Sequence, residues 1–172
     1  MGKRSDFERK PRDYYPTPIE AVKPLLVHLP EKFTFAEPCA GDGRLINHLV
    51  ENGGEVRYAY DIEPQSDWVK ERDALSQGYT QCDYIITNPP WNRKILHPMI
   101  DHFIDFKPTW LLFDSDWMHT KQSIPYMKYL SKVVSIGRVK WIEGSSSVGK
   151  DNCCWYLFER DSLYPTRFFG RT

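Results

Sequence analysis

The sequence predicts a doubly wound α/β domain with a mostly parallel sheet and an antiparallel hairpin at one edge. Short runs rich in β-branched and aromatic residues alternate along the chain with segments that carry apolar residues at helical spacing. Glycine and proline turns separate these runs. The last two extended runs follow each other without a helix between them, as in a hairpin. Strands that alternate with helices form parallel sheets covered on both faces, and 172 residues suit one such domain.

The first half of the chain contains a helix signal followed by a strand-turn-helix-strand unit. Residues 17–20 form a T-x-x-E capping box with Pro18 at the first helical position. They predict a helix with apolar residues as far as Leu29 and a bend at Pro24. The further elements expected are a strand at 33–37, a helix at 44–52 and a strand at 56–60 that ends at Asp61.

The second half continues the alternation. In chain order we expect a strand at 83–87, a helix whose apolar stripe spans 96–104, a strand at 110–114, a weaker helix at 124–130, and extended stretches at 133–141 and 153–159 joined by a polar loop. The two final stretches form the predicted edge hairpin.

Charge is balanced over the chain but not along it. The 23 Lys and Arg residues equal the 23 Asp and Glu residues, so the whole protein offers polyanions no broad attraction. Residues 1–12 differ, because cationic side chains outnumber acidic ones and almost nothing apolar is present. We expect a flexible basic arm there and a single domain over residues 13–172.

Composition excludes several classes. No apolar run approaches the ~20 residues of a membrane span, and the first residues lack the apolar core of a secretory signal, so we expect a soluble, cytoplasmic protein. The cysteines and histidines lack metal-ligand spacing, so no metal is expected. We expect reduced, buried thiols at Cys39, Cys82, Cys153 and Cys154.

The turn after the first strand has the chemistry of a ligand site. It reads Glu-Pro-Cys-Ala-Gly-Asp-Gly at 37–43, and its glycines permit a tight turn and close approach of a ligand. Asp61 follows about twenty residues later, where an acid commonly accepts hydrogen bonds from ribose hydroxyls. Glu37 and Asp42 would repel a pyrophosphate and suit a cationic cofactor. The alternative is an ordinary strand–helix turn with incidental acids.

The second candidate site is Asn88-Pro89-Pro90-Trp91, directly after a buried strand. Its prolines lock the backbone and remove two donors, which leaves a rigid rim with acceptor oxygens and an indole face. That combination suits a planar group with an exocyclic amine. The alternative is an aromatic side chain that packs after a proline turn.

In this order and spacing, the residues resemble class I S-adenosylmethionine-dependent methyltransferases, and among them phage-type DNA N6-adenine methyltransferases with an Asn-Pro-Pro-aromatic loop. The likeness covers most of the chain: residues 13–18, 37–43, 61–63, 88–91, 137–141, 149–152 and 154–156. It implies a Rossmann-like, seven-stranded sheet, S-adenosyl-L-methionine as cofactor, and DNA as the nucleic-acid partner.

The resemblance also implies residue roles. The cofactor-binding residues would be Tyr15, Pro16 and Thr17 at the methionine end, Glu37, Cys39, Gly41 and Gly43 beside it, Asp61 at the ribose, and Ile62, Asp73 and Ala74 at the adenine. The catalytic loop would comprise Asn88, Pro89, Pro90 and Trp91, with the Asn88 amide and the Pro89 carbonyl orienting the target amine and Trp91 stacking on the base. The methyl group would pass in line to the amine without a covalent intermediate.

No separate target-recognition domain is expected, so loops would contact nucleic acid. The candidates are 92–98 with Arg93 and Lys94, 116–123 with Trp117 and Lys121, and 144–150 with Lys150. The Asn-Pro-Pro-aromatic loop at 88–91 also resembles those of RNA and protein-amide methyltransferases, and a non-catalytic phage protein that binds cofactor or nucleic acid is a further alternative. A monomer in the cytoplasm of a bacterial or phage-infected cell is compatible with all of these readings.

Overall fold

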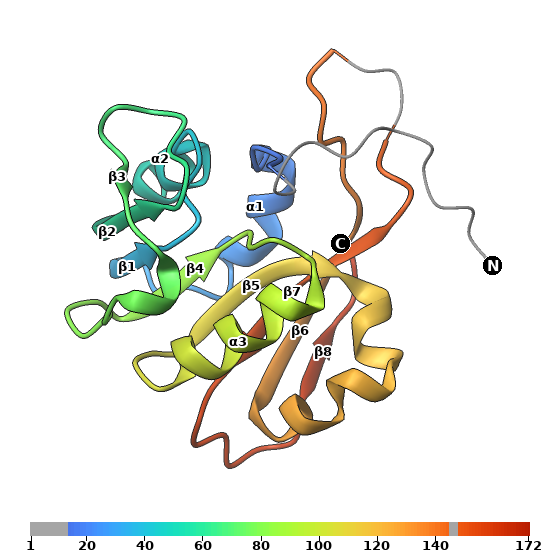
Figure 1. Ribbon diagram of the computed structural model, residues 1–172. Coiled ribbons are helices and arrows are strands. Elements are labelled where there is room, and N and C mark those ends of the chain that lie inside the picture. Colours follow the sequence, from blue (N-terminus) through green and yellow to red (C-terminus); the bar gives the residue numbers. More distant parts are fainter. Residues whose placement is uncertain (1–13, 145–147) are drawn as a thin grey trace.

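An eight-stranded sheet in the order β3-β2-β1-β4-β5-β7-β6-β8 forms the centre of the protein (Figure 1). The computed structural model describes residues 14–144 and 148–172. The basic arm expected at 1–12, and Asp13, lie outside the described residues. The strands are β1 (Phe33–Glu37), β2 (Gly54–Asp61), β3 (Lys70–Glu71), β4 (Tyr84–Thr87), β5 (Thr109–Asp114), β6 (Leu130–Arg138), β7 (Asn152–Phe158) and β8 (Arg167–Phe169).

The predicted fold class is confirmed. Strands β1 to β5 pair in parallel, and β7 runs antiparallel between β5 and β6. Within the described residues the sheet has eight strands, which is one more than the resemblance implies and two more than the six that the sequence pattern places. The unexpected strands β3 and β8 are two and three residues long and mostly exposed, so they are too short for alternation to reveal them.

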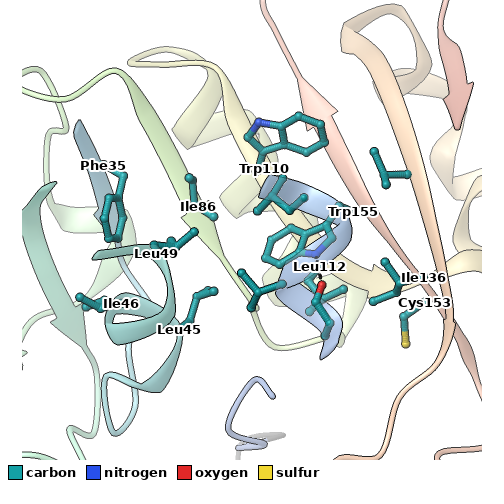
Figure 2. Close-up of a cluster of buried hydrophobic side chains, with 14 of the residues drawn as sticks. Phe35, Leu45, Ile46, Leu49, Ile86, Trp110, Leu112, Ile136, Cys153 and Trp155 are labelled. Atoms are coloured by element: carbon teal, nitrogen blue, oxygen red, sulfur yellow. Dashed lines mark hydrogen bonds between the residues drawn. The ribbon is translucent and has the colours of Figure 1, made fainter. Parts of the chain in front are cut away.

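Helices cover both faces of the sheet. The α-helices are α1 (Ile19–Leu26), α2 (Arg44–Glu51) and α3 (Arg93–Ile104), and the 3₁₀ helices are η2 (Ala74–Ser76), η3 (Ser115–His119) and η4 (Lys121–Tyr129). On one face, α1 and α2 pack on the sheet in a cluster that includes Trp110 and Leu112 of β5, and Figure 2 shows Leu45, Ile46 and Leu49 of α2 on the side of Phe35 and Ile86. On the other face, α3 packs on Leu111 and Phe113. Because both faces are covered, β5 reads as a continuous apolar run.

Two predicted elements differ from the structure. The segment expected as a helix at 124–130 belongs to η4, where Pro125 cannot donate the backbone hydrogen bond of an α-helix. The first of the two closing stretches runs from Leu130 to Arg138 rather than over 133–141, and its pairing shifts between Ser135 and Gly137, where Gly137 has a φ of 75°.

The predicted capping box does not form. Helix α1 begins at Ile19, and its N-cap is Pro18, which has no side-chain capping hydrogen bond. The Thr17 hydroxyl accepts a hydrogen bond from Asn88 instead, 3.3 Å away. Asn88, which is distant in the sequence, has therefore taken the place of the α1 backbone N–H groups as the hydrogen-bond partner of Thr17.

The prediction of reduced, buried thiols is confirmed for three of the four cysteines. All four are free thiols; Cys39 is half-buried and the others are buried. Burial raises the pKa of the Cys82 thiol to about 11. Among the described residues, no helix is long and apolar enough to cross a membrane.

Candidate functional site

A cavity of about 920 Å³ opens beyond the carboxyl ends of β1, β2 and β4. Ligands of doubly wound sheets bind at this edge. The predicted cofactor-binding residues that line the cavity are Tyr15, Pro16, Thr17, Glu37, Cys39, Gly41, Asp61, Ile62, Asp73 and Ala74. Asn88 and Pro90 of the predicted catalytic loop line it too, so the fold brings the two candidate turns to one site.

Asp61 holds the glycine turn in place. Its Oδ2 accepts a hydrogen bond from the Gly41 N–H at 2.8 Å, and its Oδ1 accepts one from the Glu63 N–H at 2.8 Å. Gly41 has a φ of 54°, and a Cβ at this position would lie 2.5 Å from the Tyr14 ring. Glycine is therefore required at position 41 both for the backbone conformation and for the packing of Tyr14.

Gly43 does not line the cavity, contrary to its predicted role. It is the N-cap of α2 with a φ of 82°, and a Cβ there would lie 2.1 Å from the Trp68 ring. Position 43 needs glycine because the Trp68 side chain packs against its backbone. The sequence of the turn alone does not show this contact.

Glu37 gives the cavity its strongest electrostatic feature. Its side chain is 2% exposed, and its Oε2 has no hydrogen-bond partner among the described residues. Burial, followed by the nearby Asp61 and Asp42 carboxylates, raises the pKa of Glu37 well above its ordinary value. A buried carboxyl oxygen without a partner is costly, so this wall suits a cationic ligand that could pair with it.

The rest of the wall is acidic as well. Asp42, Asp61, Glu63 and Asp73 line the cavity, and among the described residues no Lys, Arg or His does. Burial and Asp42 raise the pKa of Tyr14 to about 12, so its hydroxyl stays protonated. Within 14–144 and 148–172, no group of three or more His, Cys, Asp or Glu side chains is placed to hold a metal ion.

Asn88 connects the cavity to the segment before α1. Its Nδ2 donates to the Tyr15 carbonyl and to Thr17 Oγ1, both at 3.3 Å. Its Oδ1 accepts from Trp91 Nε1, also at 3.3 Å. These bonds hold the amide in one orientation, with its oxygen on the side of Trp91.

Trp91 and Pro89 of the predicted catalytic loop are not among the residues that line the cavity. Trp91 is half-buried, shares its N–H between Asn88 and the Leu112 carbonyl, and meets Trp141 edge to face with centroids 5.9 Å apart. Pro89 is buried.

Two of the predicted nucleic-acid contacts have internal roles. Trp117 is fully buried, and its Nε1 donates to His97 Nε2 at 3.0 Å, so its indole cannot reach a nucleic acid. Arg93 pairs with Asp114 at 2.8 Å and donates to the Trp91 carbonyl at 3.2 Å, which anchors the loop after Pro90. The prediction for Trp117 is wrong because packing turned the side chain inward.

The remaining basic candidates for contact with nucleic acid lie at the protein surface. Lys94, Lys121 and Lys150 are exposed. The cavity-lining residues outside every predicted motif and loop are Leu45, Gln65, Leu75 and Met99, whereas Asn92 and Ile95 belong to the loop predicted to contact nucleic acid. Asn92 had a readable signal, because an asparagine just before an apolar helix is a typical N-cap, and its side chain does cap α3.

A curated methyltransferase is similar in sequence to part of this chain. No protein-family model matches the chain. The Type II methyltransferase M.VspI of Vibrio sp. (strain 343) is 28% identical over 113 residues, and the match covers 52% of this chain and 28% of that protein. The chain therefore spans about a quarter of that relative's length.

Solved structures resemble nearly the whole chain. A proposed RNA methyltransferase of Pyrococcus horikoshii aligns with a TM-score of 0.65 at 14% identity, over 91% of this chain and 92% of that one. A proposed class I S-adenosylmethionine-dependent methyltransferase of Listeria monocytogenes aligns with a TM-score of 0.59 at 8% identity, over 89% and 64%. The chain has the class I S-adenosylmethionine-dependent methyltransferase fold.

Proposed function

We propose that the protein is an S-adenosylmethionine-dependent methyltransferase that acts on the N6 amine of adenine in DNA. The observation that carries the proposal is that the Asn88 amide lines the same cavity as the acidic side chains that suit a cationic ligand. An electrophile bound in the cavity and an amine held by Asn88 would lie next to each other, which is the arrangement a group transfer requires.

The cavity residues fit the proposed cofactor. S-adenosylmethionine supplies an electrophilic methyl group on a sulfonium. Glu37 would face a positive charge of the cofactor, and Asp61 keeps acceptor capacity for ribose hydroxyls beyond its two backbone bonds. The exposed apolar side chains of Ile62 and Leu75 offer surfaces for the adenine ring.

Asn88 would activate the target amine by accepting its hydrogens. An aryl amine is a weak nucleophile because its lone pair is delocalised into the ring. Hydrogen bonds to Asn88 Oδ1 and the Pro89 carbonyl favour a pyramidal nitrogen and direct its lone pair toward the methyl group. Oδ1 has a second lone pair for this bond besides the one used by Trp91. The proton lost after transfer passes to water.

The choice of DNA rests on the relative and on the target's accessibility. M.VspI is named a Type II methyltransferase, whereas the name of the Pyrococcus structure favours RNA as the second candidate. A paired adenine must leave the helix to reach Asn88, which costs about a few kcal/mol, and a half-buried Trp91 could offset part of that by stacking.

The test is methyl transfer from labelled S-adenosylmethionine to duplex DNA, single-stranded DNA, total RNA and protein extract, followed by digestion and identification of the product. The proposal predicts labelled N6-methyladenine from DNA. Label in RNA or protein alone would assign a different substrate, and cofactor binding without label anywhere would indicate a non-catalytic module.

A matched pair of variants tests the catalytic residue. Asn88→Ala should lower transfer at least about 100-fold, because it removes an acceptor that acts on the reacting amine. Cofactor affinity should change only a few-fold. The exposed Asn47→Ala on α2 is the control and should behave as wild type. Full turnover by Asn88→Ala would refute the assignment.

A further inference from the structure

Thr17 carries a sequence signal that its helix does not use. The capping box predicts that its hydroxyl binds the first turn of α1, yet α1 has no side-chain cap. Thr17 is 4% exposed, and its Oγ1 lies 3.3 Å from Asn88 Nδ2. A buried threonine hydroxyl directed at the candidate catalytic amide needs an explanation other than helix capping.

The explanation lies in the symmetry of the amide group. The oxygen and the NH2 of an asparagine occupy nearly the same space but have opposite hydrogen-bonding roles. Rotation of the Asn88 amide by half a turn would point NH2 at Trp91 Nε1, so that a donor would face a donor. It would also point Oδ1 at the Tyr15 carbonyl, so that an acceptor would face an acceptor. The Thr17 hydroxyl could then donate to Oδ1 instead of accepting from Nδ2, so Tyr15 and Trp91 select the orientation and Thr17 adds a third bond that holds the amide in it.

We propose that Thr17, which the resemblance places at the methionine end of the cofactor, is instead a positioning residue: its bond to Nδ2 holds the Asn88 amide in the orientation that Tyr15 and Trp91 select, with Oδ1 presented to the target amine. This inference rests on the proposed function, because only an amine substrate requires an acceptor there. The hydroxyl is the one anchor of the amide that can be removed without a change of shape: the Tyr15 anchor is backbone, and Trp91 is itself proposed to contact the base.

Thr17→Val and Thr17→Ser separate the hydroxyl from the shape of the side chain. Valine keeps the shape and loses the acceptor, whereas serine keeps the acceptor. Loss of one uncharged hydrogen bond should lower kcat about 3- to 10-fold in Thr17→Val, with the KM for cofactor and for DNA within about twofold of wild type. Thr17→Ser should retain most of the wild-type kcat.

Thr109→Val is the matched control. Thr109 is fully buried, and its hydroxyl donates to the Lys107 carbonyl at 2.8 Å, at the amino end of β5 and thus at the opposite edge of the sheet from the cavity. It loses a buried hydroxyl in the same way, so it reports any general effect of such a loss. We expect wild-type kcat for this variant.

A second readout needs no substrate or cofactor. The side-chain NH2 of Asn88 can be assigned by NMR from its absence in Asn88→Ala. In Thr17→Val its hydrogens should exchange with water faster than in wild type, and in Thr17→Ser and Thr109→Val at the wild-type rate.

The outcomes distinguish this inference from the proposed function. Absence of transfer by the wild type counts against the function and, with it, against a positioning role. With an active wild type, unchanged kcat and unchanged exchange in Thr17→Val would overturn the inference. A rise in the cofactor KM at constant kcat would overturn it too, because the hydroxyl would then serve the cofactor. Equal losses in Thr17→Val and Thr17→Ser would show that side-chain shape matters rather than the hydroxyl.

Discussion

Replacement of Asp61 by alanine should destabilise the cofactor-free protein as well as weaken cofactor binding. The carboxylate accepts hydrogen bonds from two backbone N–H groups, those of Gly41 and Glu63, each at 2.8 Å. These bonds tie the turn after β1 to the loop after β2. Asp61 is thus part of the structure of the site before any ligand arrives.

The expected magnitude follows from the different surroundings of the two N–H groups. Gly41 is buried, so its N–H would lose a charged acceptor without access to water, which costs about 1.5–3 kcal/mol. Glu63 is exposed, and its N–H can bind water, so that loss adds under about 1 kcal/mol. The free energy of unfolding should therefore fall by about 2–4 kcal/mol.

Urea unfolding, monitored by tryptophan fluorescence, measures this change in the free energy of unfolding. Calorimetric titration in the absence of urea measures cofactor binding by the folded variant. Loss of the ribose contacts should weaken binding about 100-fold, the equivalent of about 2.7 kcal/mol. Asp67→Ala removes an exposed carboxylate from the same loop and is the control. If Asp61→Ala unfolds at the same urea concentration as wild type, Asp61 does not hold the turn and the reasoning fails.

Three further predictions follow from the site and its surroundings. Gly43→Ala should lower the free energy of unfolding by about 2–4 kcal/mol, because it combines a positive φ with overlap on Trp68, and Trp68→Ala in the same chain should recover part of that loss in urea unfolding. Trp117→Ala should cost about 3–5 kcal/mol of stability but leave the DNA affinity of the folded protein unchanged in fluorescence anisotropy, and a selective loss of affinity would restore its role as a contact. Glu37 has a folded-state pKa above its ordinary value of 4.5, so its contribution to stability is fully present below that pH and is lost as the pH rises toward the folded-state pKa. Glu37→Gln should therefore flatten the pH dependence of thermal unfolding, stabilise the cofactor-free protein at neutral pH, and weaken binding of a cationic cofactor; a pH profile identical to wild type would contradict this.

Much of the site could be predicted because its key residues follow strands directly. Asp61 ends β2 and Asn88 follows β4, and the carboxyl ends of parallel strands meet at one edge of a sheet. Local pattern and topology together therefore place these side chains around one cavity. The role of each cavity residue toward cofactor and target stays a prediction.

The errors arose where distant residues decided the outcome. Trp117 follows a strand and lies in a predicted loop, but contacts with Phe113, Tyr156 and Phe158 turn it into the core. Gly43 fits a cofactor turn by type, yet Trp68 explains its presence. Asp114, at the end of another strand, pairs with Arg93, which no local pattern shows, and the contact of Arg93 with nucleic acid stays a prediction.

By itself the sequence determined the fold class, the order of the main elements and the two turns that carry the candidate chemistry, because these depend on periodicity, turn residues and spacing along the chain. Only the tertiary structure decided which hydrogen bond each polar side chain makes. Thr17 shows the reason: its hydroxyl could cap a helix or accept from Asn88, and the choice depends on where the end of β4 lies relative to the segment before α1. Such competition between a local and a distant partner is settled by packing of the whole chain, which no local pattern contains.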